Sequence, residues 1–383
     1  MKKILYLHAG AELYGADIVL LELLKKLDKT EFELYVILPT DGPLVQKLKE
    51  NNINVEVIPY PILRRKYFNI KGIINYFYTY MKYSKKLAQI AKEKQIDIVH
   101  TNTYAVLEGI YLKKKLKVKH IWHIHEIIVN PKIVYKFLCK IISKYADRVV
   151  VVSDSVKQHL IKSNYYNKVD INIIYNGIDR NKFNADNDTE YLKKEFNIRE
   201  NDIIVGMIGR VNSWKGQGDF IKAVSPILKK YQNVKAMMVG GVFEGEEWRI
   251  EQLKELINKD ENSNRILYSN FRKDVPNIHN LFDIFVLPST NPDPLPTVVL
   301  EAMATGKPVV GYRHGGICEM VKENETGLLV EPLNTVELSE KIEELISNEE
   351  KRKEYGIKSS SRQKDEFSIE SYVSKFEKLY NHV

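Results

Sequence analysis

Short runs of β-branched and other apolar residues alternate with amphipathic segments along almost the whole chain, and this alternation limits the possible folds more than any other feature. The strands predicted for the first half are residues 3–8, 34–38, 55–58, 98–101, 120–125 and 148–152. Segments with helical periodicity, such as 17–27 and 70–94, lie between them. Because each helix carries the chain back to the start of the next strand, we expect an α/β fold with a doubly wound parallel sheet.

The pattern breaks at Asn176-Gly177-Ile178-Asp179 and in the polar stretch 181–189, and then it restarts. The strands predicted for the second half are residues 203–208, 235–239, 265–268, 284–287, 309–311 and 328–330. A chain of 383 residues is also about twice the length of a typical domain. We therefore predict two Rossmann-like domains, at 1–180 and 181–365. Residues 366–383 should form a C-terminal helix, for which a return to the N-terminal domain is one option.

Positive charge is concentrated in the first domain. Residues 1–180 hold 30 Lys and Arg against 17 Asp and Glu, a net charge of +13, whereas the rest of the chain has a net charge of −5. Much of the excess lies at Arg64-Arg65-Lys66, between 71 and 94 among several tyrosines, and at 113–115. Such a surface would be attracted to phospholipid headgroups or to nucleic acid. A merely solvated lysine-rich surface is the competing explanation.

Leader, anchor and cysteine patterns point to the cell interior. The apolar run at residues 4–7 is too short for a signal peptide, and no stretch approaches the ~20 apolar residues of a membrane span. Cys139 and Cys318 are far apart and form no CxxC spacing, which disfavours a disulfide framework or a zinc site. We expect a cytoplasmic protein, with peripheral binding to the inner face of the membrane as an option.

Loops that directly follow strands are the natural place for a ligand in such sheets. The first one, His8 to Asp17, contains Gly10 and Gly15 and opens into a helix, which would suit an anion or a plain tight turn. In the second half, Gly209 and Gly216 enclose Arg210 and Lys215. An Arg fork and a Lys ammonium could hold a diphosphate and stabilise its developing charge, although solvated surface charge is the simpler explanation when the loop is read alone.

A proline-rich loop at 288–296 leads into a helix predicted to start near Thr297. Asp293 lies before this helix, and Glu301 lies about one turn inside it among apolar neighbours. A carboxylate in that setting must be exposed at a cleft or hydrogen-bonded. Its two oxygens could accept hydrogen bonds from a cis-diol such as a ribose. The alternative is a structural carboxylate that caps nearby backbone.

The order of these motifs resembles glycosyltransferase family 4, whose members are retaining enzymes with the GT-B fold. The resemblance is carried by Gly209-Arg210 and Lys215-Gly216, by Asp293-x7-Glu301-Ala-Met-Ala-x-Gly-x-Pro-Val-Val, by Gly315-Gly316, and by Gly327-Leu328-Leu329-Val330. Segments 123–126, 152–156 and 175–179 also fit, so the likeness covers nearly the whole chain. It implies two Rossmann-like domains that face each other across a cleft.

The resemblance also implies roles for particular residues. Arg210 and Lys215 would hold the diphosphate of a nucleotide-sugar donor, and Glu301 would bind its ribose. Asp293, Leu295, Pro296 and Thr297 would contact the donor sugar and phosphates, and Gly15 would lie on the donor-binding loop of the first domain. His125 would face the donor sugar, and a structural histidine is the alternative for it and for His123, which shares its face of the strand.

The sequence departs from the family pattern at three places. Asp293 replaces the usual Glu, Pro294-Leu295-Pro296 replaces a frequent Phe-Gly pair, and Tyr14-Gly15-Ala16-Asp17 stands where Gly-Gly-Ala-Glu is common. We expect these changes to tune the choice of sugar rather than to abolish donor binding.

The resulting hypothesis is a retaining hexosyltransferase of surface polysaccharide or glycoconjugate biosynthesis. It would use a nucleotide-diphosphate sugar, a saccharide acceptor that is lipid-linked, and no metal or other cofactor, because Arg210 and Lys215 would neutralise the diphosphate. A sugar-nucleotide epimerase of the same fold and a non-catalytic sugar-nucleotide-binding protein stay open. A nucleic-acid partner is disfavoured because the two halves carry opposite charge and no nucleic-acid module is present.

Overall fold

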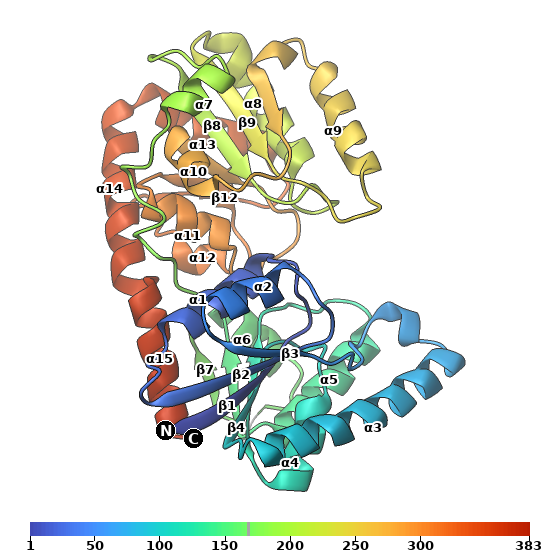
Figure 1. Ribbon diagram of the computed structural model, residues 1–383. Coiled ribbons are helices and arrows are strands. Elements are labelled where there is room, and N and C mark those ends of the chain that lie inside the picture. Colours follow the sequence, from blue (N-terminus) through green and yellow to red (C-terminus); the bar gives the residue numbers. More distant parts are fainter. Residues whose placement is uncertain (167–168) are drawn as a thin grey trace. The chain divides into compact units, whose positions relative to one another are not determined.

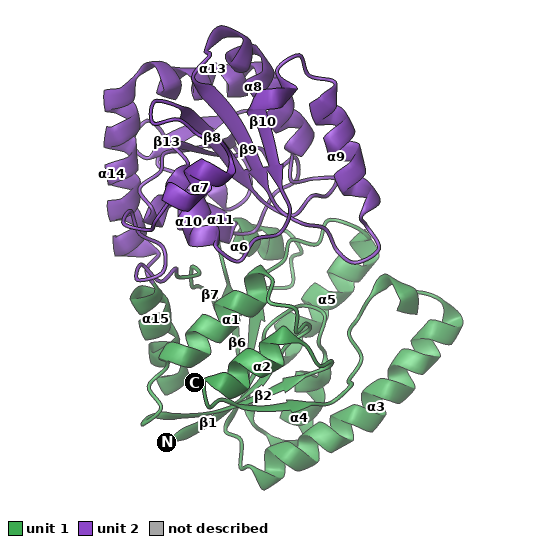
Figure 2. Cartoon of the chain, turned by 45° about the horizontal axis from the view of Figure 1, so that its top comes forward, with its two compact units in different colours: residues 1–177, 369–383 green, residues 178–368 purple. Residues whose placement is uncertain are grey.

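The computed structural model describes residues 1–166 and 169–383, and these form two compact units (Figure 2). Unit 1 comprises Met1–Gly177 and Ile369–Val383, and unit 2 comprises Ile178–Ser368. The sequence divisions were expected at 180 and 365, and the structure divides the chain at 177 and 368. The C-terminal helix α15 (Ile369–Asn381) is therefore part of unit 1.

Unit 1 is built on a seven-stranded parallel sheet with the order β3-β2-β1-β4-β5-β6-β7. Its strands are β1 (Lys2–Leu7), β2 (Phe32–Leu38), β3 (Asn54–Val57), β4 (Ile98–Thr101), β5 (Lys119–Ile124), β6 (Arg148–Val151) and β7 (Ile171–Ile173). In the register of the central strands, Ile4 lies between Leu34 of β2 and Ile98 of β4. The short strand β7 was not among the predicted strands.

The helices of unit 1 cover both faces of this sheet (Figure 1). They are α1 (Gly15–Lys26), α2 (Pro43–Glu50), the short helix η1 (Arg65–Tyr67), α3 (Ile70–Glu93), α4 (Glu108–Leu116), α5 (Lys132–Tyr145), α6 (Asp154–Ile161) and α15. From β1 the chain steps to β2 and β3, and from β4 it steps in the opposite direction to β7. Since parallel crossovers are right-handed, α1 and α2 lie on one face and α3 to α6 lie on the other.

The C-terminal helix α15 completes the core of unit 1. Its buried residues Tyr372, Phe376 and Tyr380 pack with residues of β1 and α1 in one apolar cluster. The Tyr380 hydroxyl is 2.8 Å from the Tyr6 hydroxyl of β1 and 2.8 Å from Nδ1 of His100 in β4. Residues that are more than 270 positions apart in the chain thus share one buried hydrogen-bond group.

Unit 2 contains a six-stranded parallel sheet with the order β10-β9-β8-β11-β12-β13. Its strands are β8 (Ile203–Ile208), β9 (Val234–Val239), β10 (Ile266–Ser269), β11 (Ile284–Leu287), β12 (Val309–Tyr312) and β13 (Gly327–Val330). Apart from the edge strand β10, of which only Ile266 is buried, all are short apolar runs that are buried along most of their length, as expected for a parallel sheet that is covered on both faces.

Nine helices of the described residues surround this second sheet. They are α7 (Glu190–Glu195), α8 (Gln217–Lys230), α9 (Trp248–Asn258), the short helix η2 (Ser263–Arg265), α10 (Val275–Leu281), α11 (Thr297–Ala304), α12 (Ile317–Met320), α13 (Thr335–Ser347) and α14 (Glu349–Glu366). Helix α11 begins at Thr297, where the sequence predicted it. Two Rossmann-like α/β units in series are thus confirmed.

No helix within the described residues is long and apolar enough to cross a membrane.

Candidate active site

Both sheets have a point at which the strand order changes direction. In unit 1 it lies between β1 and β4, and in unit 2 it lies between β8 and β11. Loops at the carboxyl ends of two such strands diverge and leave room for a ligand. Most of the site residues expected from the sequence lie on loops next to these two points, and each unit is described by itself below.

In unit 2, the loop after β8 is held in shape by backbone contacts. The Asn212 side-chain oxygen accepts hydrogen bonds from the backbone N–H groups of Trp214, at 3.0 Å, and Lys215, at 2.8 Å. Gly216 has φ of 87°, and a Cβ there would lie 1.8 Å from the carbonyl oxygen of Pro288. Glycine is therefore required at 216, because the loop after β8 passes directly against the end of β11.

The Lys215 ammonium donates a hydrogen bond to Oδ2 of Asp293, on the loop after β11. Both side chains are about 85% buried, with exposed fractions of 15% and 14%. The structure therefore brings together two residues that the sequence placed 78 positions apart. Without a ligand, the carboxylate of Asp293 neutralises a cation that was expected to meet phosphate.

Arg210 is oriented by an aromatic ring. Its guanidinium carbon lies 3.5 Å from the ring centroid of Phe243, on the loop after β9. Stacking of this kind fixes the plane of the guanidinium fork while leaving its edge able to donate hydrogen bonds. Gln217 adds a hydrogen bond of 3.0 Å to the Arg210 carbonyl oxygen.

The Asp293 loop rests on the glycine turn between β12 and α12. The Gly316 N–H donates to the Asp293 carbonyl oxygen at 2.8 Å, and a Cβ at Gly316 would lie 2.1 Å from the Pro294 carbonyl oxygen. Leu295 and Pro296 are buried, so their side chains are directed into the unit. Thr297 is half-buried at the first turn of α11.

Glu301, on α11, is hydrogen-bonded to a buried histidine. Nε2 of His279 in α10 lies 3.1 Å from Oε2 of Glu301. His279 is fully buried and the Glu301 side chain is 13% exposed. Because a carboxylate can only accept, His279 donates and fixes one oxygen of Glu301. This carboxylate has the hydrogen-bond partner that its apolar surroundings require.

In unit 1, three residues at the ends of neighbouring strands form a buried chain of hydrogen bonds with Asp17 of α1. Nε2 of His8 is 2.6 Å from Oδ1 of Asp17, Nδ1 of His8 is 3.1 Å from Nδ2 of Asn102, and Oδ1 of Asn102 is 3.0 Å from Nε2 of His125. His8 follows β1, Asn102 follows β4 and His125 follows β5. We call these four residues the histidine relay.

The direction of each hydrogen bond in the relay follows from its carboxylate end. Asp17 can only accept, so His8 donates through Nε2 and accepts at Nδ1 from the Asn102 amide. The Asn102 oxygen then accepts from Nε2 of His125, which leaves Nδ1 of His125 with its lone pair. Burial acts to raise the pKa of Asp17, but the hydrogen bond and charge of His8 together with backbone N–H donors outweigh it, and the pKa lies below its usual value.

His125 is held as a neutral ring. Burial lowers its pKa to about 3, so the ring offers one hydrogen-bond donor and one acceptor at neutral pH. Its neighbour His123 is completely buried, and burial likewise lowers its pKa far below the usual value. The two ring centroids are 4.0 Å apart. His123 packs in the interior, whereas His125 is only half-buried at the end of its strand.

Gly15 is the exposed first residue of α1. Two residues later, Oδ2 of Asp17 accepts a hydrogen bond of 3.0 Å from the Tyr14 N–H. The carboxylate that anchors the histidine relay therefore also closes the amino end of α1. Asp17, which stands where Glu is common in the family pattern, is thus part of the polar network of unit 1.

Sequence reasoning missed several residues of these networks. His8 and Asn102 could have been found, because each directly follows a strand beside the point where the strand order reverses. His279 and Phe243 gave no such signal, since their contacts with Glu301 and Arg210 exist only in the folded unit. Within the described residues, no three His, Cys, Asp or Glu side chains form a candidate metal site.

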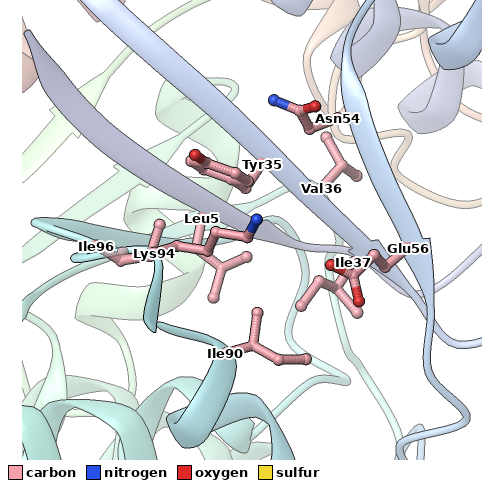
Figure 3. A pocket seen from close by; sticks show the side chains of 9 residues that line it. All are labelled: Leu5, Tyr35, Val36, Ile37, Asn54, Glu56, Ile90, Lys94 and Ile96. Carbon is pink, nitrogen blue, oxygen red and sulfur yellow. The ribbon is translucent and has the colours of Figure 1, made fainter. Parts of the chain in front are cut away.

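A small pocket in unit 1 does not involve any of these residues. Figure 3 shows Leu5, Ile90 and Ile96 among its lining residues, with Tyr35 above them and Lys94 beside Ile96. It lies between β2, β3 and the carboxyl end of α3 and is largely apolar.

Comparison with known proteins matches each part of the chain to a family. Residues 14–182 match the family described as Glycosyltransferase Family 4, and residues 188–362 match Glycosyl transferases group 1. A relative from Escherichia coli, the UDP-Gal:alpha-D-GlcNAc-diphosphoundecaprenol alpha-1,3-galactosyltransferase, is 28% identical over 88% of this chain and 85% of its own. The N-acetyl-alpha-D-glucosaminyl L-malate synthase of Bacillus anthracis is 28% identical over 78% of each chain.

Solved structures agree on the fold. The crystal structure of Anabaena Alr3699/HepE in complex with UDP and glucose has a TM-score of 0.86 over 100% of both chains, with 24% identity. The same conclusion follows from the two family matches, the two parallel sheets and the motifs on their loops. The chain is a glycosyltransferase of the GT-B fold, with an N-terminal part that belongs to Glycosyltransferase Family 4 and a C-terminal part that belongs to Glycosyl transferases group 1.

Proposed function

We propose that this enzyme transfers a hexose-type sugar from a nucleotide-diphosphate donor to a saccharide acceptor that is lipid-linked, with retention of configuration, in surface polysaccharide or glycoconjugate biosynthesis. The observation that carries the proposal is the contact between Lys215 and Asp293 at the strand-order reversal of unit 2. A largely buried ammonium on the same loop as a guanidinium that is stacked on a ring suits an anion with several oxygens. UDP in the HepE structure and the lipid diphosphate in the name of the E. coli relative support the two substrate classes.

The donor site follows from the contacts of each residue. Arg210, held in its orientation by Phe243, and Lys215 would neutralise the two phosphates. Glu301 has one oxygen held by His279, and its other oxygen would accept from the ribose hydroxyls. The diphosphate would share Lys215 with Asp293, and this carboxylate would then fix the position of the ammonium rather than compete with it.

In the transfer step, the bond between the anomeric carbon and the diphosphate oxygen breaks and its electron pair stays with the diphosphate. An acceptor hydroxyl attacks from the same face, and its proton passes to a diphosphate oxygen. Arg210 and Lys215 stabilise the charge that builds on the leaving group, which is the largest contribution we assign to this chain. Nδ1 of His125 would accept a hydrogen bond from a hydroxyl of the donor sugar.

A panel of nucleotide sugars tests the proposal, because a bound ligand stabilises the folded state by about 2.7 kcal/mol at 100 times its Kd. The stabilising donor is then incubated with a polyprenyl-diphosphate saccharide in excess EDTA, and the anomeric configuration of the product is read by NMR. We expect transfer with retention and no loss in EDTA. Epimerised donor in the absence of acceptor would point to the epimerase, and activity that returns only with Mg²⁺ would contradict the metal-free step.

A lipid-linked acceptor would bring the enzyme to a membrane surface. The net charge of +13 on residues 1–180 suits an anionic leaflet, where each basic residue near the surface contributes about 1 kcal/mol. We propose reversible, peripheral binding there. The L-malate synthase relative has a small acceptor in its name, so transfer to water-soluble acceptors must be assayed in parallel.

A further inference from the structure

Helix α3 has two apolar faces, although a helix on a protein surface needs only one. One face packs on unit 1: Tyr76 and Tyr80 stack at 6.2 Å between centroids, and Ser84, Leu87, Ala88 and Ala91 are buried. The other face is Ile70, Ile73, Ile74 and Phe77, at the spacing i, i+3, i+4, i+7. These four are 79%, 58%, 65% and 64% exposed. We call them the α3 ridge.

The α3 ridge lies on a part of the helix that stands away from the core. All the buried residues of α3 belong to its carboxyl half, from Ser84 onward. Phe68 before the helix and Tyr78 within it extend the apolar surface, with exposed fractions of 43% and 70%. Figure 1 shows α3 along the outer side of unit 1. Contiguous exposed apolar side chains of this kind mark an interaction site.

A border of positive charge lies before the ridge in the chain and along one flank of α3. Residues 64–94 contain nine Lys and Arg and one acidic residue, Glu93. Exposed members of this border are Arg64, Arg65, Lys66, Lys71, Lys82 and Lys85. An apolar stripe bordered by cations and nearly free of carboxylates is the composition of helices that lie in the interface of anionic bilayers.

A second helix on the same face of the sheet repeats the pattern. In α5, Ile133 and Phe137 are one turn apart and 82% and 52% exposed. Lys132, Lys136 and Lys140 are exposed at intervals of four residues beside them. Both α3 and α5 run back from the carboxyl edge of the sheet, since each begins after a parallel strand ends. This is the edge at which His125 lies.

We propose that the α3 ridge inserts into an anionic phospholipid bilayer, with Ile70, Ile73, Ile74 and Phe77 below the headgroups and the basic border at the level of the phosphates. This proposal rests on the membrane-borne acceptor proposed above and adds the surface that binds. Within α3, Tyr76 and Tyr80 pack inside unit 1, whereas the ridge faces outward. Insertion of about 5–10 Å would bring the carboxyl edge of the sheet close to a lipid-linked acceptor.

The test is flotation of the full chain with vesicles of phosphatidylglycerol and phosphatidylcholine, compared with vesicles of phosphatidylcholine alone. We expect binding to the anionic vesicles, weakened by high salt because the basic border is screened. The variant Ile74→Asp/Phe77→Asp should lower the partition coefficient at least about tenfold, since two apolar side chains no longer leave water. Charge reversal at Arg64, Arg65 and Lys66 should lower it as well.

The matched control is Ile357→Asp, because Ile357 is 72% exposed on α14 of unit 2 and should not touch lipid. All variants should transfer sugar to a water-soluble acceptor at the rate of the parent, which shows that they fold. Equal partition of the parent and Ile74→Asp/Phe77→Asp would overturn the proposal. So would self-association without lipid that this variant abolishes, because the ridge would then bind a second copy. Intact sugar transfer in either case would leave the proposed function standing.

Discussion

The two strand-order reversals of this chain carry opposite kinds of polar group. In unit 2, a cation and a carboxylate from neighbouring loops are in contact, and a guanidinium is stacked on a ring. In unit 1, the corresponding loops carry two histidine rings and an amide, and their chain of hydrogen bonds ends on one buried carboxylate. One fold used twice has thus placed cations at one edge and a directed chain of hydrogen bonds at the other.

The difference separates two tasks of a sugar transfer. A diphosphate needs compensation of charge, which depends little on direction and is supplied by long cationic side chains. A sugar needs discrimination among hydroxyl groups, which depends on whether each protein atom donates or accepts. The histidine relay determines which ring nitrogen of His125 donates and which accepts. The cationic loop of unit 2 needs no such arrangement, because it only compensates charge.

Removing a cation from unit 2 should produce the largest effect. Arg210→Ala or Lys215→Ala should lower turnover by about 10²–10³-fold, the scale of losing one group that stabilises developing charge. The control is Lys222→Ala on α8, whose side chain is 70% exposed. Steady-state assays with the stabilising donor measure the change. Full activity in the variant that carries both substitutions would show that unit 2 does not act through compensation of charge.

The next effect concerns nucleotide binding in unit 2. Glu301→Gln should weaken binding of the free nucleoside diphosphate by about 1–3 kcal/mol, because a charged hydrogen-bond acceptor is lost. Calorimetry measures this, and Glu340→Gln, on the exposed side of α13, serves as the control. Asp293→Asn should instead change the preference among donor sugars. An unchanged Kd for Glu301→Gln would show that the ribose lies elsewhere.

In unit 1, the relay should respond to loss of its carboxylate. Asp17→Asn removes the charge-assisted bond to His8, and we expect turnover to fall about tenfold, which corresponds to about 1.4 kcal/mol. The ¹⁵N shifts of the His125 ring should show a proton on Nε2 in the parent and a mixture of tautomers in the variant. Asp28→Asn, on the surface after α1, is the control. A parent ring protonated on Nδ1 would contradict the direction assigned to the relay.

The smallest effect is an acid sensitivity confined to unit 1. Burial lowers the pKa values of His120 and His125 to about 3, below the value of about 6.5 in an unfolded chain. The unfolded state therefore binds more protons, and the free energy of unfolding falls as pH falls below 6.5. We expect a loss of about 1 kcal/mol for each histidine between pH 6.5 and 5.5.

Hydrogen exchange, corrected for the intrinsic rate at each pH, can compare the two sheets. Protection should decrease in β5 of unit 1 and change little in β8 of unit 2, whose neighbouring charges are paired carboxylates and cations. An equal decrease in both strands would mean that buried histidines do not distinguish the units.

The sequence predicted what depends on local pattern. Twelve of the thirteen strands follow from apolar runs and glycine turns, and β7 was missed because Ile171-Asn172-Ile173 is too short to show a period. The helix over 70–94 was predicted from its amphipathic spacing, but spacing alone could not tell that the side with Ile73 and Ile74 would stay in water. That depends on which face the tyrosines occupy in the folded unit.

The contacts between side chains in the candidate site could not be predicted from the sequence, for a related reason. Lys215 and Asp293 were expected to share a ligand, yet their direct contact depends on how closely Gly216 lets the loop pass Pro288. The contact of His279 with Glu301 joins the motif on α11 to α10, a helix that carries no motif. The motifs identified which loops matter, and tertiary packing decided what each side chain touches.

The position of α15 has a consequence for the order of synthesis. A ribosome makes residues 369–383 only after all of unit 2 has been made, yet Phe376 and Tyr380 are fully buried in the core of unit 1. During translation, the first unit therefore cannot complete its core before the second unit has been synthesised. An N-terminal domain usually folds first, but the core of this one has to wait for α15. A chaperone that binds exposed apolar surface would find its target near the beginning of the chain until the helix that follows unit 2 emerges.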